Sequence, residues 1–541
     1  MKRALRASCA VLGVSDGTVP VGDSAVKGRR AGKLERICPR LVKGVGIPSD
    51  TFFVKPLPKM FLLPGLFLFA GSVLAAARPN VLVILADDMG CGDVRAFNME
   101  SKIPTPHMDR LAAQGLVFRD AHSASSIGGV ARYGLMTGRY CWRNDPSFHE
   151  AMGFDPPLVS QDRFTLGDLF KQSGYRTAYF GNWGLGLGWV SREGGTGSWE
   201  RGYTGTGETL GIDFSKPVLG GPNTLGFDYF FGTAASLDRP PYAFIENDST
   251  IGIPDKVTRA GGRKGLTVEG FRAIDALPGL TRKAVQYLQR QAASPSGEPF
   301  FLFVSLTAPH TPFVPTEQVS GRSQAGRYGD SVALADWSVG RLLNALEKTG
   351  LVRDTLVLLT SDNGSMKSND EMEPAYGHRP GHLYRGRKGD PWEGGHRVPL
   401  IVQWPRKLQP GTTHEVVCQT DLLATFADIL GAALPADAGE DSFSFLPVLQ
   451  GKVLEKPVRE SIIHYAAYGS FAIREGKWKL ILPPEHPVPR AIQAPTAGQL
   501  YDLESDIGET RNLWEQHPAR VDRLRKLLEK YRAQKGSKGD S

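Results

Sequence analysis

Cysteine is scarce in this chain. It occurs five times in 541 residues, and only Cys91, Cys141 and Cys418 lie beyond residue 77. Three cysteines allow one disulfide at most, and their spacing matches no zinc-binding pattern. The sequence also has no internal repeat and no coiled-coil heptad, and no apolar run reaches the roughly 20 residues that a membrane span requires. These absences argue against a disulfide scaffold, a zinc finger, a repeat protein and an integral membrane protein.

A surplus of one charge is confined to the start of the chain. Residues 1–59 carry twelve basic and four acidic residues, which accounts for the whole net charge of +8. Residues 60–541 are neutral, so we expect no nucleic-acid-binding face in the folded part. Residues 1–59 also show little hydrophobic periodicity. We interpret them as a leader or an extension upstream of the true start, without folded structure.

The next segment has the three parts of a secretory signal peptide. Basic residues precede Met60, a short apolar stretch follows over 61–70, and small residues end the segment at Ala77. This order predicts a signal peptide at 60–77. A membrane anchor is the alternative, but the apolar stretch is too short to span a bilayer. The prediction implies export to the periplasm or the extracellular space, no stable membrane span after signal removal, and Met60 as an alternative start to Met1.

Two apolar runs, far apart in the sequence, end in similar polar pairs. The run that begins at Val81 leads into Asp87 and Asp88, and a second run leads into Asp362 and Asn363. Unbroken branched runs are typical of strands buried inside a parallel sheet, and ligands collect at the carboxyl ends of such strands. Four oxygen-bearing side chains without Cys or His suit Ca²⁺, or Mg²⁺, better than zinc. Two solvated acids at a loop start are the alternative for a single pair.

The order of elements indicates an α/β fold in two parts. Strand and helix patterns alternate over residues 78–455, which predicts a large, doubly wound mixed sheet with helices on both faces. Over residues 456–541 a hairpin, a further strand and one amphipathic helix predict a small antiparallel sheet with a helix. We therefore expect two domains with these boundaries after the signal peptide.

Several loops are candidates for ligand contact. Residues 123–139 combine a small-residue loop with a helix, and a helix N-terminus is a ready anion site. Residues 384–389 form a basic loop. The Gly-rich insertion at 186–225 and the segment 236–242 are expected to influence specificity, although the sequence does not place them. A helix is expected at 281–292.

Five short motifs can be compared with known families: Pro79-Asn80 with Ala86 to Gly90, Tyr133 to Tyr140, Ala308 to Pro312, Thr360 to Gly364 and Trp392 to Pro399. Together they resemble the sulfatase family, more narrowly its arylsulfatase-like branch, from Arg78 to about Lys535. The resemblance implies an alkaline-phosphatase-like α/β core, sulfate-ester substrates and a calcium ion held by Asp87, Asp88, Asp362 and Asn363. It also implies sulfate-site positions for Arg132, His310 and Lys388.

The chemistry of these residue types fits sulfate esters. Fixed Lys and Arg charges and a divalent cation stabilise charge that develops on the leaving oxygen. A neutral His310 would donate a proton to the leaving group. The alternatives are a packed loop histidine for His310 and surface charges for Lys388 and Arg132.

The sequence departs from the family at the reacting group. Members carry a Cys or Ser, within C/S-x-P-x-R, that is oxidised to formylglycine, whose hydrated aldehyde is the nucleophile. The ungapped equivalent here places Gly128 at the nucleophile and Val130 at the proline. In the family motif G-K-W-H-x-G, the Lys and His positions are Asn182 and Gly184. Glycine has no side chain to oxidise, so formylglycine is not expected.

Three functions remain open from the sequence. One is an exported arylsulfatase-like hydrolase with weak turnover through another nucleophile, such as Ser125, Ser126 or a Ca²⁺-bound water. The second is a non-catalytic protein in which the metal, Arg132, Lys388 and His310 hold a sulfated small molecule or glycan. Asn182, His310 and Lys388 are the expected substrate-binding residues. The third, a phosphatase of the same fold, lacks the Ser/Thr nucleophile and extra metal ligands that this chemistry usually uses. We expect almost no release of aryl alcohol from 4-nitrophenyl sulfate.

Overall fold

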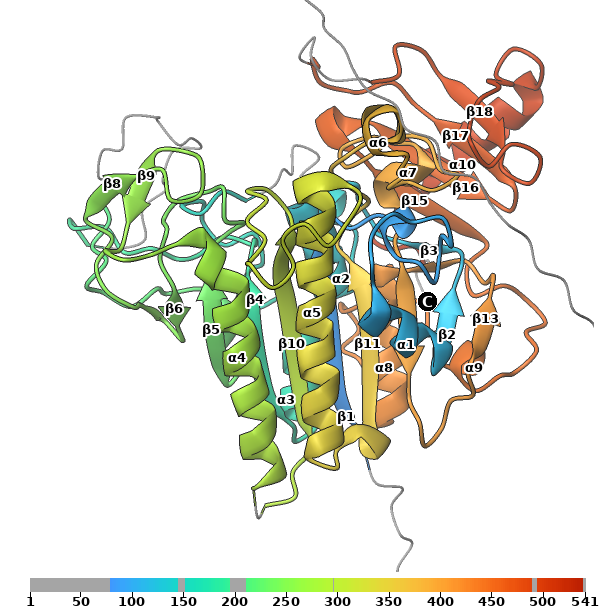
Figure 1. The fold of residues 1–541 in the computed structure, drawn as a ribbon. Coiled ribbons are helices and arrows are strands. Elements are labelled where there is room, and N and C mark those ends of the chain that lie inside the picture. Colours follow the sequence, from blue (N-terminus) through green and yellow to red (C-terminus); the bar gives the residue numbers. More distant parts are fainter. Residues whose placement is uncertain (1–77, 145–150, 195–210, 295, 489–493, 539–541) are drawn as a thin grey trace, which may run out of the picture. The chain divides into compact units, whose positions relative to one another are not determined.

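One large mixed sheet organises the molecule in a computed structural model (Figure 1). The structure describes residues 78–144, 151–194, 211–294, 296–488 and 494–538; the predicted leader and signal peptide lie outside them. The strand order is β13-β2-β12-β11-β1-β10-β4-β5-β6-β7. The bounds are β1 (Asn80–Asp87), β2 (Leu116–Phe118), β4 (Arg176–Asn182), β5 (Tyr229–Thr233), β6 (Ile245–Glu246), β7 (Ser249–Thr250), β10 (Phe300–Pro309), β11 (Thr355–Ser361), β12 (Leu400–Gln403) and β13 (Gly411–Thr413).

The centre of the sheet is parallel. Strand β1 pairs in parallel with β10 on one side and β11 on the other, and β10, β4 and β5 continue in the same direction. Strand β12 runs antiparallel to both β11 and β2. The sheet is therefore mixed, as predicted, and the carboxyl ends of five parallel strands meet at one edge.

Helices cover both faces of this sheet (Figure 1). One hydrophobic cluster packs strand residues with α1, α4 and α5, and the other packs strand residues with α2, α3 and α8. This arrangement confirms the predicted doubly wound architecture. The bounds are α1 (Pro106–Ala113), α2 (Gly128–Thr137), α3 (Leu166–Gln172), α4 (Ala273–Ala292), α5 (Gly326–Lys348) and α8 (Leu422–Leu430).

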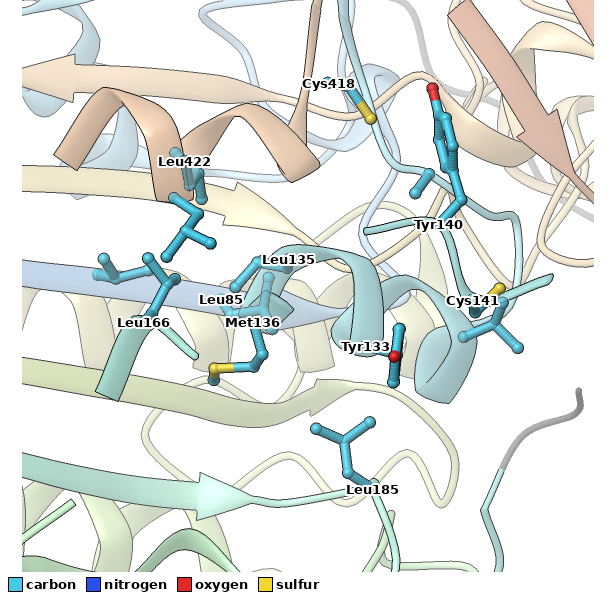
Figure 2. Packing of buried hydrophobic residues seen from close by; sticks show 14 of the residues in the cluster. Leu85, Tyr133, Leu135, Met136, Tyr140, Cys141, Leu166, Leu185, Cys418 and Leu422 are labelled. Carbon is cyan, nitrogen blue, oxygen red and sulfur yellow. The ribbon is translucent and has the colours of Figure 1, made fainter. Parts of the chain in front are cut away.

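The alternation of side chains along β1 explains the two clusters. Val81, Val83 and Leu85 belong to one cluster, whereas Leu82 and Ile84 belong to the other. Successive strand residues point to opposite faces, so an unbroken apolar run serves both helical layers. Figure 2 shows part of the cluster that contains Leu85, where side chains of α2, α3 and α8 gather beside the end of β1.

The C-terminal part forms a second, four-stranded antiparallel sheet. Its strands follow one another in the order β15-β16-β17-β18, and buried residues of one helix pack with it. This agrees with the predicted fold class, while the boundary at residues 455 and 456 stays a prediction. The bounds are β15 (Ser461–Tyr465), β16 (Phe471–Glu475), β17 (Trp478–Ile481), β18 (Gln499–Asp502) and α10 (Pro518–Ala533).

Short elements complete the described residues. The remaining strands and helices are β3 (Ala121–His122), β8 (Lys256–Thr258), β9 (Gly265–Thr267), β14 (Val417–Cys418), α6 (Asn369–Tyr376), α7 (Glu393–His396) and α9 (Leu446–Leu449). The 3-10 turns are η1 (Cys91–Asp93), η2 (Cys141–Arg143), η3 (Pro222–Thr224), η4 (Val352–Asp354), η5 (Gln419–Asp421) and η6 (Ala467–Gly469).

Two local expectations need correction. The helix expected at 281–292 begins eight residues earlier, at Ala273, and includes Pro278. Its first turns are held because Ala276 and Leu277 are buried, which outweighs the cost of an internal proline. The hairpins β6-β7 and β8-β9 follow the Gly-rich insertion and were not predicted, since strands of two or three residues carry almost no periodic signal.

The state of the cysteines and the length of the apolar helices can be read directly from the structure. Cys91, Cys141 and Cys418 are buried free thiols, so no disulfide links the described residues. Within those residues, every helix is too short or too polar to cross a bilayer.

Candidate active site

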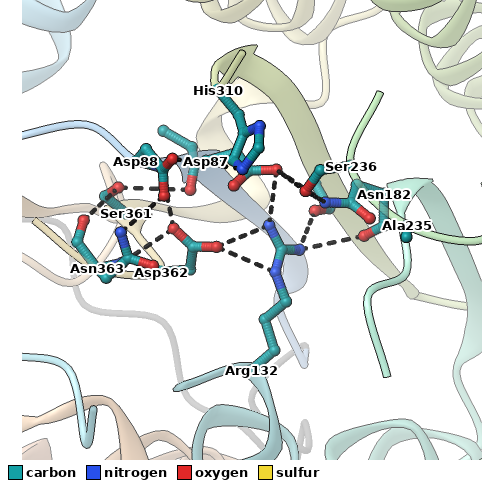
Figure 3. Close-up of polar contacts among 12 residues, drawn as sticks. Asp87, Asp88, Arg132, Asn182, Ala235, Ser236, His310, Ser361, Asp362 and Asn363 are labelled. Atoms are coloured by element: carbon teal, nitrogen blue, oxygen red, sulfur yellow. Dashed lines mark hydrogen bonds and ion pairs between the residues drawn. The ribbon is translucent and has the colours of Figure 1, made fainter. Parts of the chain in front are cut away.

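The polar residues that follow the parallel strands meet at one edge of the large sheet (Figure 3). Asp87 ends β1 and Asn182 ends β4. Asp362 directly follows β11, and His310 directly follows β10. All four side chains are nearly inaccessible to solvent. The sheet topology therefore brings together residues separated by more than 270 positions.

The two acidic pairs are in direct contact. The backbone N–H of Asp88 donates to Oδ1 of Asp362 at 3.0 Å, and Nδ2 of Asn363 donates to Oδ1 of Asp88 at 2.8 Å. Asp88 adopts a positive φ of 69°, a conformation that Asp tolerates better than most residues. The carboxylate of Asp88 thus contacts Asn363, which follows β11. The predicted convergence of the four side chains is present, and their role as metal ligands stays a prediction.

Arg132 reaches this group from α2. Its Nη2 lies 2.9 Å from Oδ2 of Asp362 and 3.3 Å from Oδ2 of Asp87. Its Nη1 donates to the backbone oxygen of Asn182 and to the hydroxyl of Ser305 on β10. Arg132 is only 3% exposed, so it is not the surface charge that the alternative interpretation offered. The contact with Ser305 was not foreseen, because that serine lies inside an apolar strand run.

Lys388 and His310 both approach Asp88. Nζ of Lys388 lies 2.8 Å from Oδ1 of Asp88, and Nε2 of His310 lies 3.5 Å from its Oδ2. Nδ1 of His310 is 2.7 Å from the backbone oxygen of Thr311, which fits a proton on Nδ1. Oδ1 of Asp238 lies 3.8 Å from the same Nδ1. The three residues assigned to a sulfate site thus surround the acidic pairs.

Two further residues, Asn182 and Ser236, donate hydrogen bonds to the carboxylate of Asp87. Nδ2 of Asn182 donates to its Oδ2 at 2.8 Å, and the hydroxyl of Ser236 donates to the same oxygen at 3.3 Å. Asn182 also donates to Ser236 at 3.0 Å. The sequence singled out the loop 236–242 without placing it, and the structure shows that this loop orients Asp87.

Crowded charges shift the pKa values of the site. Burial raises the pKa of Asp362 to about 7, with the neighbouring Asp87 carboxylate adding to the effect. Burial acts on Asp87 in the same sense, but His310 and Arg132 bring the pKa of its carboxyl below the usual value. For His310, burial and Lys388 are outweighed by Asp88 and the other carboxylates, so its pKa is raised. The site is a compact set of opposing charges in a dry environment.

The donor set suits a hard cation. The ligand atoms of Asp87, Asp88 and His310 lie within 4.8 Å of one another. Oδ1 of Asn363 is buried and receives no hydrogen bond from any described residue. An unpaired carbonyl oxygen beside crowded carboxylates is what a Ca²⁺ or Mg²⁺ ion would satisfy, because these ions prefer oxygen ligands. The residues present therefore fit the metal that the resemblance implies.

The nucleophile position lies at the start of α2. Gly128 is the first residue of this helix, four positions before Arg132. Oγ of Ser125 accepts a hydrogen bond from the backbone of Ile127. Oγ of Ser126 is buried and has no hydrogen-bond partner among the described residues. Among the residues that the structure describes, neither serine hydroxyl has a hydrogen bond to a histidine or lysine that would activate it.

The histidine position of the motif G-K-W-H-x-G is also occupied by a glycine, Gly184. Gly184 has a φ of +68°, and a Cβ added there would lie 3.3 Å from Cδ of Arg132. An L-residue is strained in this conformation, so a histidine does not fit the present backbone without adjustment. Oδ1 of Asn182 is buried without a hydrogen-bond partner beside this glycine.

Comparison with known proteins identifies the family. The sulfatase family model matches residues 79–432, and a model of the C-terminal part of N-sulphoglucosamine sulphohydrolase matches residues 390–534. The chain belongs to the sulfatase family. This family protein is 32% identical over 524 residues to N-acetylgalactosamine-6-O-sulfatase of Bacteroides thetaiotaomicron, covering 86% of this chain and 97% of that protein. It is 32% identical over 483 residues to arylsulfatase A of Homo sapiens, and the match covers 83% of this chain and 86% of that protein.

A solved structure agrees with the assignment. It comes from work on the metabolism of multiple glycosaminoglycans by Bacteroides thetaiotaomicron, and it superposes with a TM-score of 0.74 at 30% identity. The match covers 84% of this chain and all of the other chain. The resemblance read from the motifs is confirmed: this protein is an alkaline-phosphatase-like member of the sulfatase family whose relatives include sulfate ester hydrolases.

Proposed function

We propose that this sulfatase-family protein binds a sulfated small molecule or glycan at a calcium site without formylglycine-dependent hydrolysis. The observation that carries the proposal is the glycine at position 128, at the start of the helix that presents Arg132 to Asp362. The charged framework of the site is present, whereas the position of the attacking group has no side chain. A site of this kind retains the means to bind an anion and lacks the means to attack it.

The calcium ligands in this proposal are the two acidic pairs. Asp87, Asp88, Asp362 and Asn363 supply oxygen atoms, and the unpaired Oδ1 of Asn363 is the main support. A bound calcium ion supplies positive charge for sulfate oxygens. Mg²⁺ is the alternative ion, but it demands stricter octahedral geometry than Ca²⁺.

Lys388 and His310 are the ligand contacts in this proposal. The side chain of Lys388 is 14% exposed while its ammonium lies against Asp88, so it borders both the acidic pairs and solvent. An ammonium beside a metal site binds sulfate as a point charge. Asn182 replaces the family lysine and adds an uncharged amide in place of a third cation.

The relatives suggest the type of ligand. The N-acetylgalactosamine-6-O-sulfatase that aligns with most of this chain is named for a sulfated amino sugar. N-Acetylgalactosamine 6-sulfate is therefore the first ligand to test. Binding is expected with Ca²⁺ and not after removal of Ca²⁺ by chelation. The Lys388→Met variant should bind at least about tenfold more weakly, because it loses one charge-assisted contact.

Turnover separates the proposal from an ordinary hydrolase. Purified protein with Ca²⁺ is expected to release almost no 4-nitrophenol from 4-nitrophenyl sulfate. Turnover comparable to that of an ordinary sulfatase would contradict the proposal. Failure of the wild-type protein to bind any sulfated sugar would also contradict it.

Slow hydrolysis through Ser126 is a second candidate. Its hydroxyl is buried without a partner, and its backbone oxygen accepts from the N–H of Gly389, the neighbour of Lys388. Trace sulfate release that disappears in Ser126→Ala and persists in Ser125→Ala would establish this candidate. A phosphatase function has no comparable support, because neither Ser125 nor Ser126 has a hydrogen bond to a histidine or lysine among the described residues.

We also propose export. The signal peptide at 60–77 supports this proposal, and the relevant residues lie outside those that the structure describes. Expression in the native host should give an extracellular or periplasmic protein whose first residue is close to Arg78. A cytoplasmic protein that retains residues 60–77 would contradict this proposal.

A further inference from the structure

We propose that Lys479 is a positioning residue for Lys388, acting through a buried ion cluster that fixes the turn α7 against the C-terminal sheet. The ion cluster consists of Lys479, Glu393, Glu509 and His396. Lys479 lies on β17, Glu393 and His396 belong to α7, and Glu509 follows β18. The inference rests on the proposed ligand-binding role of Lys388.

The ammonium of Lys479 is completely buried and surrounded. Its Nζ lies 3.0 Å from Oε1 of Glu393, 2.8 Å from Oε1 of Glu509 and 3.0 Å from Nε2 of His396. All four side chains are fully inaccessible to solvent. A lysine is rarely buried unless it is paired, and here three acceptor atoms lie within 3.0 Å of the ammonium.

Glu509 connects the ammonium to the helical turn. Its Oε2 accepts a hydrogen bond of 2.6 Å from the backbone N–H of Glu393, the first residue of α7. Its own backbone has a positive φ of 51°. One carboxylate therefore binds both Lys479 and the first N–H of the turn. Glu393 in turn accepts from Nε of Arg397 at 2.7 Å, which closes the far end of the turn.

The turn lies directly on the loop that carries Lys388. The backbone N–H of Gly394 donates to the oxygen of Arg385 at 2.7 Å. A Cβ added to Gly395 would lie 2.1 Å from the backbone oxygen of Asp390, so the two backbones touch. The loop 385–390 is thus packed between α7 and the site. We therefore expect a displacement of α7 to shift the backbone of Lys388.

A second layer of histidines extends the cluster. Nδ1 of His396 lies 3.0 Å from Nδ1 of His122, and Nε2 of His122 lies 2.7 Å from Asp120. These contacts, together with Lys479, form a chain of hydrogen bonds with one donor and one acceptor at each step. Burial lowers the pKa of both histidines, which agrees with neutral rings.

The geometry favours this chain over a metal site of three histidines. His464 is stacked on His396 with ring centroids 3.5 Å apart and an interplanar angle of 10°. Lone pairs on imidazole nitrogens lie in the ring plane, so those of two stacked rings do not converge on one ion. The Lys479 ammonium also occupies the Nε2 side of His396.

A double-mutant cycle tests the route through Lys388. Binding of N-acetylgalactosamine 6-sulfate to Ca²⁺-loaded protein is measured for wild type, Lys479→Met, Lys388→Met and the double variant. We expect Lys479→Met to weaken binding by about tenfold and to add nothing in the Lys388→Met background, because coupled residues are not additive. Lys477→Met is the matched control: that lysine lies two positions away, is exposed and pairs with Asp502.

Hydrogen exchange provides a readout that does not require a ligand. Lys479→Met should accelerate amide exchange across residues 385–397 and leave the central residues of α5 unchanged. If Lys479→Met does not fold, Glu509→Gln, which keeps the side-chain shape, replaces it in both experiments. Absence of ligand binding by the wild type, or an unaffected Lys388→Met variant, would overturn the proposed function, and the exchange result would then decide the inference alone.

Either of two results overturns the inference. One is a variant with lowered thermal stability but unchanged affinity and unchanged exchange at 385–397. The other is a loss of affinity in Lys479→Met that adds in full to the loss in Lys388→Met. Both would mean that Lys479 stabilises the fold without positioning Lys388.

Discussion

Nη2 of Arg132 lies 2.9 Å from Oδ2 of Asp362, inside the group of side chains assigned to the metal. In the proposed site, the guanidinium and a calcium ion would therefore neutralise the same carboxylates. Asp362 is the member whose pKa is raised to about 7, by burial and by the neighbouring Asp87. Stability measurements with and without calcium should therefore show how far Arg132 and a bound ion can replace each other.

Arg132→Met should make the protein depend on calcium. Removal of one partner from a buried ion cluster leaves an uncompensated charge and typically costs about 3–5 kcal/mol. Added Ca²⁺ should recover part of this loss, so the calcium-induced rise in melting temperature should be larger in the variant than in the wild type. Differential scanning calorimetry with and without chelator measures both. Equal shifts in the two proteins would show that Arg132 and the ion act independently.

Asn363→Ala should weaken calcium binding. The substitution removes the unpaired Oδ1 and the hydrogen bond from Nδ2 to Asp88. For the wild type, free Ca²⁺ at about 100 times its dissociation constant should add about 2.7 kcal/mol to the free energy of unfolding. The variant should show less than half of this gain at the same concentration. Asp238→Asn, at the edge of the site, is the control and should keep it.

The fold was predictable because its central strands are long and apolar on both faces. The run from Val81 to Leu85 has to be buried on two sides, which indicates a parallel strand covered by helices. The same logic located Asp87 and Asp362 at neighbouring strand ends. By contrast, β6 to β9 were not predictable, because they are only two or three residues long. The first turns of α4 were missed because Pro278 argues against a helix there.

Stability should fall as the pH falls below about 6.5. Burial holds the pKa values of His122, His396 and His464 below the usual value, so their folded-state pKa values are lower than the unfolded ones. A depressed pKa contributes stability above about 6.5 that is lost as the pH falls toward the folded-state value. Glu509, with its pKa raised to about 7 by burial, opposes this trend, because its contribution is lost as the pH rises through about 7.

His464→Phe tests the sign of this effect. The aromatic ring keeps the stack on His396 and removes Nε2, which is buried without a partner. Urea unfolding at pH 7.5 and pH 5.5 should show a smaller loss of stability in the variant than in the wild type, because one protonation step is gone. An equal or larger loss in the variant would show that His464 is not buried in its neutral form.

Restoring the family residues should restore chemistry. Gly128→Cys with Val130→Pro, co-expressed with the formylglycine-forming enzyme, should give measurable hydrolysis of 4-nitrophenyl sulfate. Asn182→Lys and Gly184→His should increase it, although Gly184 requires a backbone adjustment because its φ is +68°. Val130→Pro alone is the control and should remain inactive. An inactive full set, with formylglycine verified by mass spectrometry, would show that more than the reacting group is missing.

The sequence did not predict the residues that position other site residues. Ser236 contacts Asp87 from a loop with no motif, and Ser305 contacts Arg132 from inside an apolar strand. Lys479 lies in a hairpin that reads as an ordinary amphipathic strand. Such residues become visible only when burial and distance are known, because their types and spacings occur equally on protein surfaces.

One experiment tests the central claim most directly. N-Acetylgalactosamine 6-sulfate is titrated into the calcium-loaded protein in a calorimeter, and free sulfate in the cell is then measured by ion chromatography. We predict a saturable heat of binding and no free sulfate above that of a protein-free control. Free sulfate in molar excess over the protein, or no heat of binding with any sulfated sugar, would contradict the account.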